Sequence, residues 1–260
     1  MKMKIPAAAL AAAATFAHAG IIGSTGVTPA ASAAAAASAA SGVDPAVAAK
    51  RAADAAALQQ AGALIQGRQP QAAIDTVLNP LIASHEAEVR DSQASVYCAN
   101  TPAESLMYLV SAANAKKSAL VVDGTLCNAY FMRGFAEVDL GQIKAAAADY
   151  DHVLALSPHN PHYLNEVGQF HSRLRDWNGA LALFHRAEDD AKAFAVEGRA
   201  NAELGLALRG IGFVDVELGK LDEAEALYRR CLEIDTNDGK AKAELGYVQG
   251  LKAKQAGLAK

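Results

Sequence analysis

The stretch Ser157–Tyr163, which reads SPHNPHY, places His159 and His162 three residues apart between two prolines. Imidazole nitrogens at short spacing are common metal ligands, and a stable zinc site needs three or four ligands that converge. Glu166 follows His162 by four residues, so the two side chains share one face if the segment is helical. The stretch therefore raises two hypotheses, a metal site at His159, His162 and Glu166 or a polar turn that is rich in histidine.

Sequence signatures of catalysis are missing from the rest of the chain. It contains no G-x-S-x-G, no H-E-x-x-H and neither of the glycine-rich motifs that cradle phosphates. Its three cysteines, Cys98, Cys127 and Cys231, do not form C-x-x-C. We therefore expect no catalytic residue, no cofactor and no enzymatic activity.

The bulk composition limits the possible partners. The 260 residues have a formal net charge of −4 and a pI near 6.0, with both signs of charge mixed along the chain. A nucleic-acid binder needs a basic face to neutralise phosphates, so nucleic acid is not an expected partner. The chain also has no run of about 18 apolar residues, which excludes a membrane-spanning helix at the level of sequence.

The first 45 residues resemble a targeting segment followed by a tether. MKMK gives a positive start, a short alanine-rich apolar run follows, and Ala17-His18-Ala19 fits an A-x-A cleavage pattern. We expect a signal peptide over 1–19, cleaved after Ala19, and export to the periplasm or the medium. The alternative is an alanine-rich tail on a cytosolic protein. Residues 20–45 are low in complexity and indicate a flexible linker.

Export bears on the cysteines. In an oxidising compartment Cys98–Cys127 is the favoured bridge, although three cysteines leave the pairing open. Cys231 has a different explanation, because it falls at a repeat position where a small buried side chain is expected.

Three segments of the second half of the chain share one pattern around a break. A glycine precedes each break by seven residues, and an apolar residue, an alanine and an aromatic residue follow it by two, five and nine. The breaks are Gly141, Arg175 and Gly219; the apolar residues Ile143, Trp177 and Leu221; the alanines Ala146, Ala180 and Ala224; the aromatics Tyr150, Phe184 and Tyr228. The glycines Gly134, Gly168, Gly212 and Gly246 are spaced by 34, 44 and 34 residues.

This pattern resembles the tetratricopeptide repeat (TPR) family, whose unit is a helix–turn–helix of about 34 residues. The best match is LRGIGFVDVELGKLDEAEALYRRCLEID, 208–235. The resemblance implies an all-α fold, an α-solenoid of antiparallel helix–turn–helix repeats. Each glycine lets the second helix of its unit approach the first, and neighbouring units must stack to bury their apolar faces.

The resemblance divides the chain into units of unequal clarity. We expect a divergent helical or TPR-like region over 46–126, repeats over 127–160, 161–204 and 205–238, and a partial repeat or capping helix over 239–260. The wide glycine spacing predicts that the second helix of 161–204 and the first helix of the next unit are both lengthened. Thr101 with Glu104 predicts a helix start, with a helix through about Lys117. We read SALVVDG, 118–124, as helix because helix formers flank it.

The repeat also bears on the opening question. Pro158 falls at the end of one unit and Pro161 at the start of the next, which places His159 in the turn and His162 in the first turn of a helix. This favours the polar turn, so we predict no metal site and keep His159/His162/Glu166 as a minor alternative.

In the TPR family the first helices of successive units line a groove that holds a peptide or a partner helix. The resemblance therefore implies a non-catalytic interaction module with a protein partner. The candidate groove residues are Asn128, Phe131, Phe135, His162, Asn165, Gln169, Arg173, Arg209, Phe213 and Tyr247. One alternative is that Phe131 and Phe135 pack against upstream helices; another is that the protein is a structural adaptor of a cell-envelope or secretion assembly that uses its convex face.

Some TPR modules grip the C-terminal tails of chaperones through a clamp of lysine, asparagine and arginine. The matching positions here are Phe131, Phe135, Glu166, Leu206 and Gly210. None of these side chains suits a carboxylate, so the resemblance does not extend to that clamp.

Overall fold

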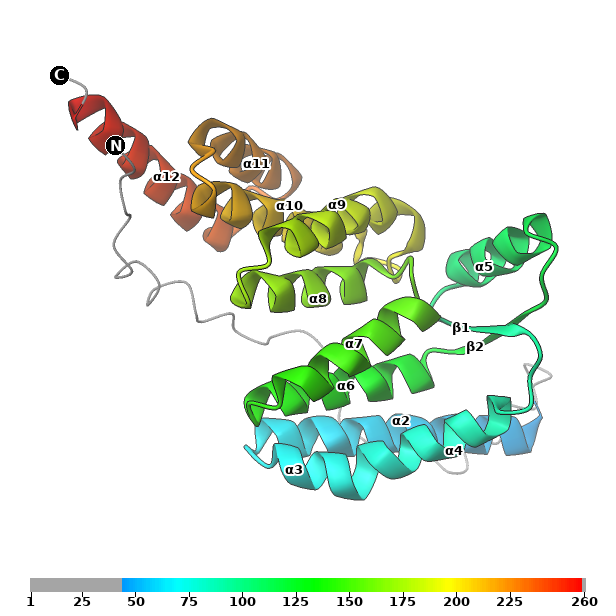
Figure 1. Cartoon of the computed structure of the whole chain (residues 1–260). Coiled ribbons are helices and arrows are strands. Elements are labelled where there is room, and N and C mark those ends of the chain that lie inside the picture. Colours follow the sequence, from blue (N-terminus) through cyan, green and yellow to red (C-terminus); the bar gives the residue numbers. More distant parts are fainter. Residues whose placement is uncertain (1–43, 259–260) are drawn as a thin grey trace.

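The computed structural model describes residues 44–258, which form helical hairpins stacked side by side and one small sheet (Figure 1). In chain order the elements are α2 (Pro45–Gln66), α3 (Pro70–Ala73), the π-helical η2 (Ile74–Leu78), α4 (Asn79–Val89), β1 (Ser95–Ala99), α5 (Pro102–Asn114), β2 (Ala119–Asp123), α6 (Thr125–Asp139), α7 (Ile143–Leu156), α8 (Pro161–Arg173), α9 (Trp177–Phe194), α10 (Ala200–Glu217), α11 (Leu221–Ile234) and α12 (Gly239–Leu258). Among the described residues no helix is long and apolar enough to cross a membrane. The predicted signal peptide, 1–19, and all but the last two residues of the predicted linker, 20–45, lie outside the described residues.

The first hairpin pairs α2 with the continuous helical run α3–η2–α4. Asp44 caps α2 by accepting a hydrogen bond from the Ala46 amide, and Pro45 opens the helix. The turn at Gly67-Arg68 holds Arg68 at a φ of 58°. Across the hairpin, Nε2 of the buried His85 lies 3.0 Å from Oδ2 of Asp54. This hairpin occupies the upstream region where the repeat pattern of the sequence is weakest.

Two strands interrupt the helices in a region for which the sequence analysis predicts helix. β1 pairs in parallel with β2, with Cys98 opposite Val122. The prediction of helix for 118–124 is therefore wrong, and 91–126 is not wholly helical. Val121 and Val122 are β-branched and suit a pleated strand. Their pairing with β1 runs across α5, a non-local contact that the helix formers beside them do not reveal.

Helix α5 is fixed by a polar network on its inner face. The Thr101 hydroxyl caps the helix by accepting from the Glu104 amide at 3.1 Å, as the sequence predicts, and the helix ends at Asn114 rather than near Lys117. Glu104 is fully buried and accepts hydrogen bonds from the Asn100 amide at 2.7 Å and from the Tyr108 hydroxyl at 3.3 Å. This network holds α5 on the strands, while most of the helix stands apart from the hairpin stack (Figure 1).

A disulfide ties the sheet to the repeats. Cys98 of β1 is bonded to Cys127 of α6, with the two Cα atoms 6.2 Å apart and a sequence separation of 29. This is the pair that the sequence analysis favours. The bond fixes the strands, which lie outside the repeat pattern, to the first helix of the first clear repeat.

The breaks of the sequence pattern fall at the turns between the paired helices. Gly141, Arg175 and Gly219 have φ values of 72°, 59° and 78°, the left-handed region that often ends a helix. In each turn the two residues after the helix donate back to carbonyls of its last turn, as Gly141 does to Val138 at 3.0 Å. The break is therefore a conformational requirement, which Arg175 meets without being glycine.

Glycines of the first helices allow the second helices to approach, as the pattern predicts, and the groups that meet them are aromatic rings. A Cβ atom at Gly134 would lie 2.9 Å from the ring of Tyr150, one at Gly168 would lie 2.8 Å from Phe184, and one at Gly212 would lie 2.9 Å from Tyr228. These distances are too short for a real side chain, so each unit depends on its glycine. The fourth position, Gly246, has nothing within 4 Å.

The alanines and Cys231 occupy the small buried positions that the register assigns to them. Ala146, Ala180 and Ala224 are each 0% exposed, and Cys231 is 1% exposed. Burial raises the pKa of the Cys231 thiol to about 11. Cys231 is thus a packing residue of the core.

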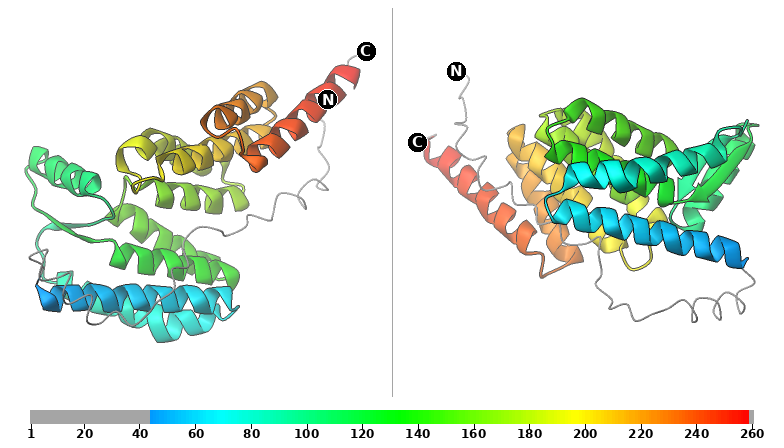
Figure 2. Two further views of the ribbon diagram at one scale, coloured as in Figure 1. Left: turned by 180° about the vertical axis from the view of Figure 1, so that it is seen from behind. Right: turned by 90° about the horizontal axis from the view of Figure 1, so that it is seen from below.

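The wide glycine spacing lengthens two adjacent helices, as predicted. Helices α9 and α10 each have 18 residues, whereas α7 has 14 and α8 has 13. Two further views show the stack continuing from the α2–α4 hairpin at one end to α12 at the other (Figure 2). The extension of α10 toward its N-terminus brings new residues beside α8, and this shapes the candidate site.

Candidate partner-binding face

The first helices of the repeats, α6, α8 and α10, adjoin one another through His162. The ring of His162 on α8 meets the edge of the Phe131 ring of α6, with centroids 5.5 Å apart. On the other side its Nδ1 atom lies 3.5 Å from Oε1 of Glu203 on α10. We call the side of the molecule formed by these first helices and α12 the first-helix face.

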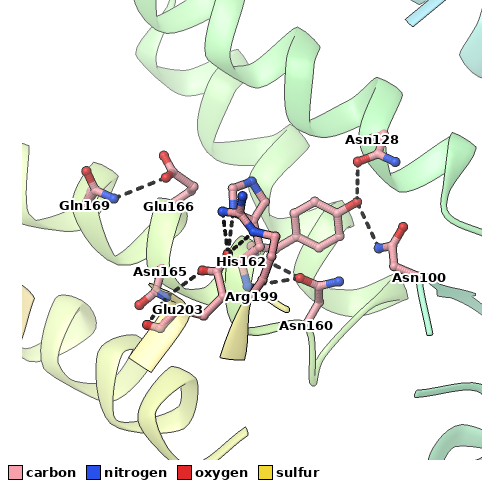
Figure 3. Close-up of polar contacts among 10 residues, drawn as sticks. Asn100, Asn128, Asn160, His162, Asn165, Glu166, Gln169, Arg199 and Glu203 are labelled. Carbon is pink, nitrogen blue, oxygen red and sulfur yellow. Dashed lines mark hydrogen bonds and ion pairs between the residues drawn. The ribbon is translucent and has the colours of Figure 1, made fainter. Parts of the chain in front are cut away.

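Glu203 is the centre of a buried polar cluster (Figure 3). It is 2% exposed and accepts hydrogen bonds from Nη2 of Arg199 at 3.0 Å and from Nδ2 of Asn165 at 3.1 Å. Burial alone would raise the pKa of Glu203, but His162, Arg199 and Asn165 lower it to about 2. The carboxylate is therefore ionised, and its partners join α8 to α10.

His162 responds to the same contact. Burial alone would lower the pKa of the imidazole, but the hydrogen bond and the charge of Glu203 outweigh it and raise the pKa above its usual value. Its side chain is 27% exposed, so it lies at the edge of the cluster and not inside it.

The structure places the ten predicted groove residues in three different settings. Two of them, Phe131 and Asn165, are buried at 4% and 0% exposure, and their side chains serve packing and the Glu203 cluster. Arg173 and Tyr247 are exposed. The half-buried remainder is Asn128, Phe135, His162, Gln169, Arg209 and Phe213.

Several half-buried members already have partners within the chain. Arg209 forms an ion pair with Asp238, and Gln169 donates to Glu166 at 3.3 Å. The Phe213 ring meets the edge of Trp177 at a centroid distance of 6.3 Å. Phe131 packs against rings of α7 and α8, and it belongs to the same hydrophobic core cluster as residues of the upstream hairpin.

The three candidate metal ligands point to different partners. Nδ1 of His159 lies 2.9 Å from Oδ2 of Asp190, while His162 pairs with Glu203 and Glu166 accepts from Gln169. Within residues 44–258, no three His, Cys, Asp or Glu side chains are arranged to hold a metal ion. The histidines of SPHNPHY join neighbouring helices by polar contacts.

An open cleft of about 860 Å³ adjoins the first-helix face at the carboxyl ends of β1 and β2. Asn128 of α6 is the one predicted residue in its lining, where Asn100, Asp123 and Leu109 also lie. The Tyr163 hydroxyl connects the cleft to α8, because it donates to Oδ1 of Asn128 at 2.8 Å.

The cleft depends on the two strands, so it could not be predicted while 118–124 was expected to be helical. The available signal was Val96 and Tyr97 before the capped helix that starts at Thr101, and Val121 and Val122 after it, a β–α–β order.

Comparisons with known proteins agree with this architecture. The model of the tetratricopeptide repeat family matches residues 128–160 and 211–238. Among solved structures, pilF from Pseudomonas aeruginosa is similar over 78% of this chain and 71% of its own, with 14% identity and a TM-score of 0.53.

Two further solved structures are less similar. The first TPR of Spaghetti (RPAP3), solved with an HSP90 peptide, covers 51% of this chain and 97% of its own at 23% identity and a TM-score of 0.43. BtubC from P. vanneervenii covers 78% and 82% at 16% identity and a TM-score of 0.46. A comparison with curated proteins gives no match. At these identities the similarities concern the fold.

Proposed function

Because this chain is a tetratricopeptide repeat protein, we propose that it is a non-catalytic interaction module that holds a peptide or a partner helix on its first-helix face. No catalytic step is assigned to any residue. The observation that supports this most directly is that His162 of α8 contacts Phe131 of α6 and Glu203 of α10, so that the three first helices adjoin one another. Half-buried residues of α6 and α8 accompany it, namely Asn128, Phe135 and Gln169. Half-buried amide and aromatic groups on rigid helices suit recognition of another chain.

Substitution of Arg173 can test whether a partner binds to the first-helix face. It is exposed near the end of α8. Reversal of its charge should therefore leave the fold intact and change only what approaches the face. The matched control is Lys144, which is exposed on α7, the second helix of its unit.

The experiment is capture of partners from a cell-envelope extract by the chain without residues 1–19, compared among the wild type, Arg173→Glu and Lys144→Glu. A photo-reactive phenylalanine at 173 or at 144 then reports which face is in contact. We expect capture and cross-linking to depend on position 173 and not on position 144. If Lys144→Glu loses the partner and Arg173→Glu keeps it, the second-helix face binds, which is the adaptor alternative.

We also propose export to the periplasm or the medium, with cleavage after Ala19. The Cys98–Cys127 disulfide supports this location, because such bonds persist in oxidising compartments and are rare in the cytosol. Mass spectrometry of the chain purified from its source tests the proposal. A mature N-terminus at Gly20 is expected, and an intact Met1 with reduced cysteines would contradict it.

A further inference from the structure

The cleft beside β1 and β2 has no net charge, and its lining divides into a polar side and an apolar side. Among its lining residues the only charged ones are Arg51 and Asp123, whose nearest atoms lie 3.9 Å apart. One side carries uncharged hydrogen-bonding groups, including the amides of Asn100 and Asn128. The other side is apolar.

The two amides are oriented by a buried tyrosine. Tyr163 is 1% exposed; its hydroxyl donates to Oδ1 of Asn128 at 2.8 Å and accepts from Nδ2 of Asn100 at 3.4 Å (Figure 3). These contacts leave Nδ2 of Asn128 as a donor and Oδ1 of Asn100 as an acceptor. One donor and one acceptor side by side match the carbonyl and the amide of a polypeptide backbone.

The position of Asn100 depends on a glycine. A Cβ atom at Gly124 would lie 1.9 Å from Oδ1 of Asn100. Any side chain at 124 would displace the asparagine and break the arrangement. Gly124 thus offers a way to move one amide without replacing it.

The apolar side of the cleft comes from the outward face of α5. Leu106 and Leu109 line the cleft at 64% and 47% exposure, and Val110 beside them is 47% exposed. These three residues face outward because Glu104 and Tyr108, which are buried, occupy the inward face of α5. An apolar helix face left in water is a typical mark of an interaction site.

We propose that this cleft binds an uncharged, extended segment of a partner polypeptide. One peptide group of the segment pairs with Asn128 and Asn100, and an apolar side chain next to it packs on Leu106 and Leu109. The proposal rests on the proposed interaction function and adds the chemistry of the partner. A charged side chain is disfavoured, because Arg51 and Asp123 already neutralise each other and an unpaired charge loses hydration on burial.

A phosphate ligand is disfavoured by the same local chemistry. The cleft lies at the N-terminal ends of α5 and α6, where anions often bind. Both ends already have an acidic partner, since Asp123 accepts from the Thr125 amide at 3.0 Å and Glu104 accepts from the Asn100 amide.

The test begins with a selection on the full mature chain. The probe is a library of N-acetylated, C-amidated nonapeptides that is randomised at its five central positions. We expect enriched peptides without charged residues at these positions and with Leu, Ile, Met or Phe at one of them. Enrichment of charged peptides, or of none, would overturn the proposal.

Variants then locate the bound peptide by fluorescence polarisation. Asn128→Asp keeps the acceptor for Tyr163 and removes the donor, and Leu109→Ser removes the apolar contact; each should raise Kd at least tenfold. Leu174→Ser, at an apolar residue 49% exposed after α8, is the matched control and should leave Kd unchanged. Circular dichroism checks that each variant is folded.

A backbone methylation scan identifies the paired peptide group. Methylation of one amide nitrogen in the peptide should raise Kd for the wild type, and it should lose this effect in Gly124→Ala, where Asn100 is displaced. Unchanged Kd values in Asn128→Asp and Leu109→Ser would refute the cleft as the site. If only Arg173→Glu weakens peptide binding, the interaction function stands and the cleft proposal fails. If only Asn128→Asp and Leu109→Ser weaken it, the cleft proposal stands, and the part of the first-helix face around Arg173 is not the binding surface.

Discussion

Substitution of Gly212 by leucine would place a branched side chain where α10 and α11 touch. A Cβ atom at this position would lie 2.9 Å from Cζ and 3.0 Å from Cε1 of Tyr228, whose side chain is 0% exposed. Because the ring is fully buried, either the ring or the two helices must shift to admit the new side chain. Overpacking of this kind costs about 1–3 kcal/mol, and leucine brings three carbons beyond Cβ.

Gly246 provides the control that isolates this cost. It is in the same register, one unit further along, but nothing lies within 4 Å of a Cβ atom there. Leucine in place of glycine in a helix adds about 0.8 kcal/mol of stability at either position. That gain cancels in the comparison, so the difference between Gly212→Leu and Gly246→Leu should equal the overpacking cost, about 1–3 kcal/mol or more.

The assay is urea unfolding followed by circular dichroism, with free energies from linear extrapolation. Gly212→Leu should unfold at lower urea than the wild type, and Gly246→Leu at equal or slightly higher urea. A difference between the two variants below about 0.5 kcal/mol would refute the argument that the glycines set the distance between paired helices.

Three further outcomes follow from contacts described above. Replacement of Cys98 and Cys127 by alanine should lower the free energy of unfolding by about 3–4 kcal/mol, since it frees a loop of 29 residues in the unfolded chain; urea unfolding shows this, and an equal stability would contradict it. Because the folded-state pKa of His162 is raised by Glu203, its contribution to stability is complete below about pH 6.5 and falls as the pH rises through the raised pKa. The urea midpoint should therefore fall less between pH 5.5 and pH 8 in His162→Gln than in the wild type, and identical slopes would exclude the coupling. Tyr228→Phe should raise stability by about 1 kcal/mol in thermal melts, because the buried hydroxyl has no hydrogen-bond partner among the described residues; a clear loss would indicate a bound water or ligand.

The repeat units could be predicted from sequence because their determinants are local and periodic. Gly168 and Phe184 lie 16 residues apart in one hairpin, and Arg175 marks the turn between them. The strands could not be read in this way, because Val122 prefers extended structure only weakly and its partner Cys98 lies across a whole helix. Pairing decides a strand, and pairing is not visible in the run itself.

The burial of the candidate groove residues could not be predicted from sequence. The positions were carried over from a unit of regular length, whereas the lengthened α10 begins at Ala200. Glu203 therefore lies against α8 and accepts a hydrogen bond from Asn165. Asn165 is buried in this polar cluster and is not accessible to a partner. An insertion between units changes which groove positions stay accessible even when the helical register is kept.

The Cys98–Cys127 bond has a mechanical consequence. Hairpins that touch only their neighbours can detach one after another when the two ends of a chain are pulled apart. The disulfide removes from that extension the segment it closes, 29 residues, or roughly 100 Å of straightened backbone at about 3.3–3.6 Å per residue. When the oxidised protein is pulled, β1, α5 and β2 would stay inside the loop that the disulfide closes while the helices on either side unfold. The segment that forms the cleft would therefore add no length to the extended chain until the disulfide is reduced.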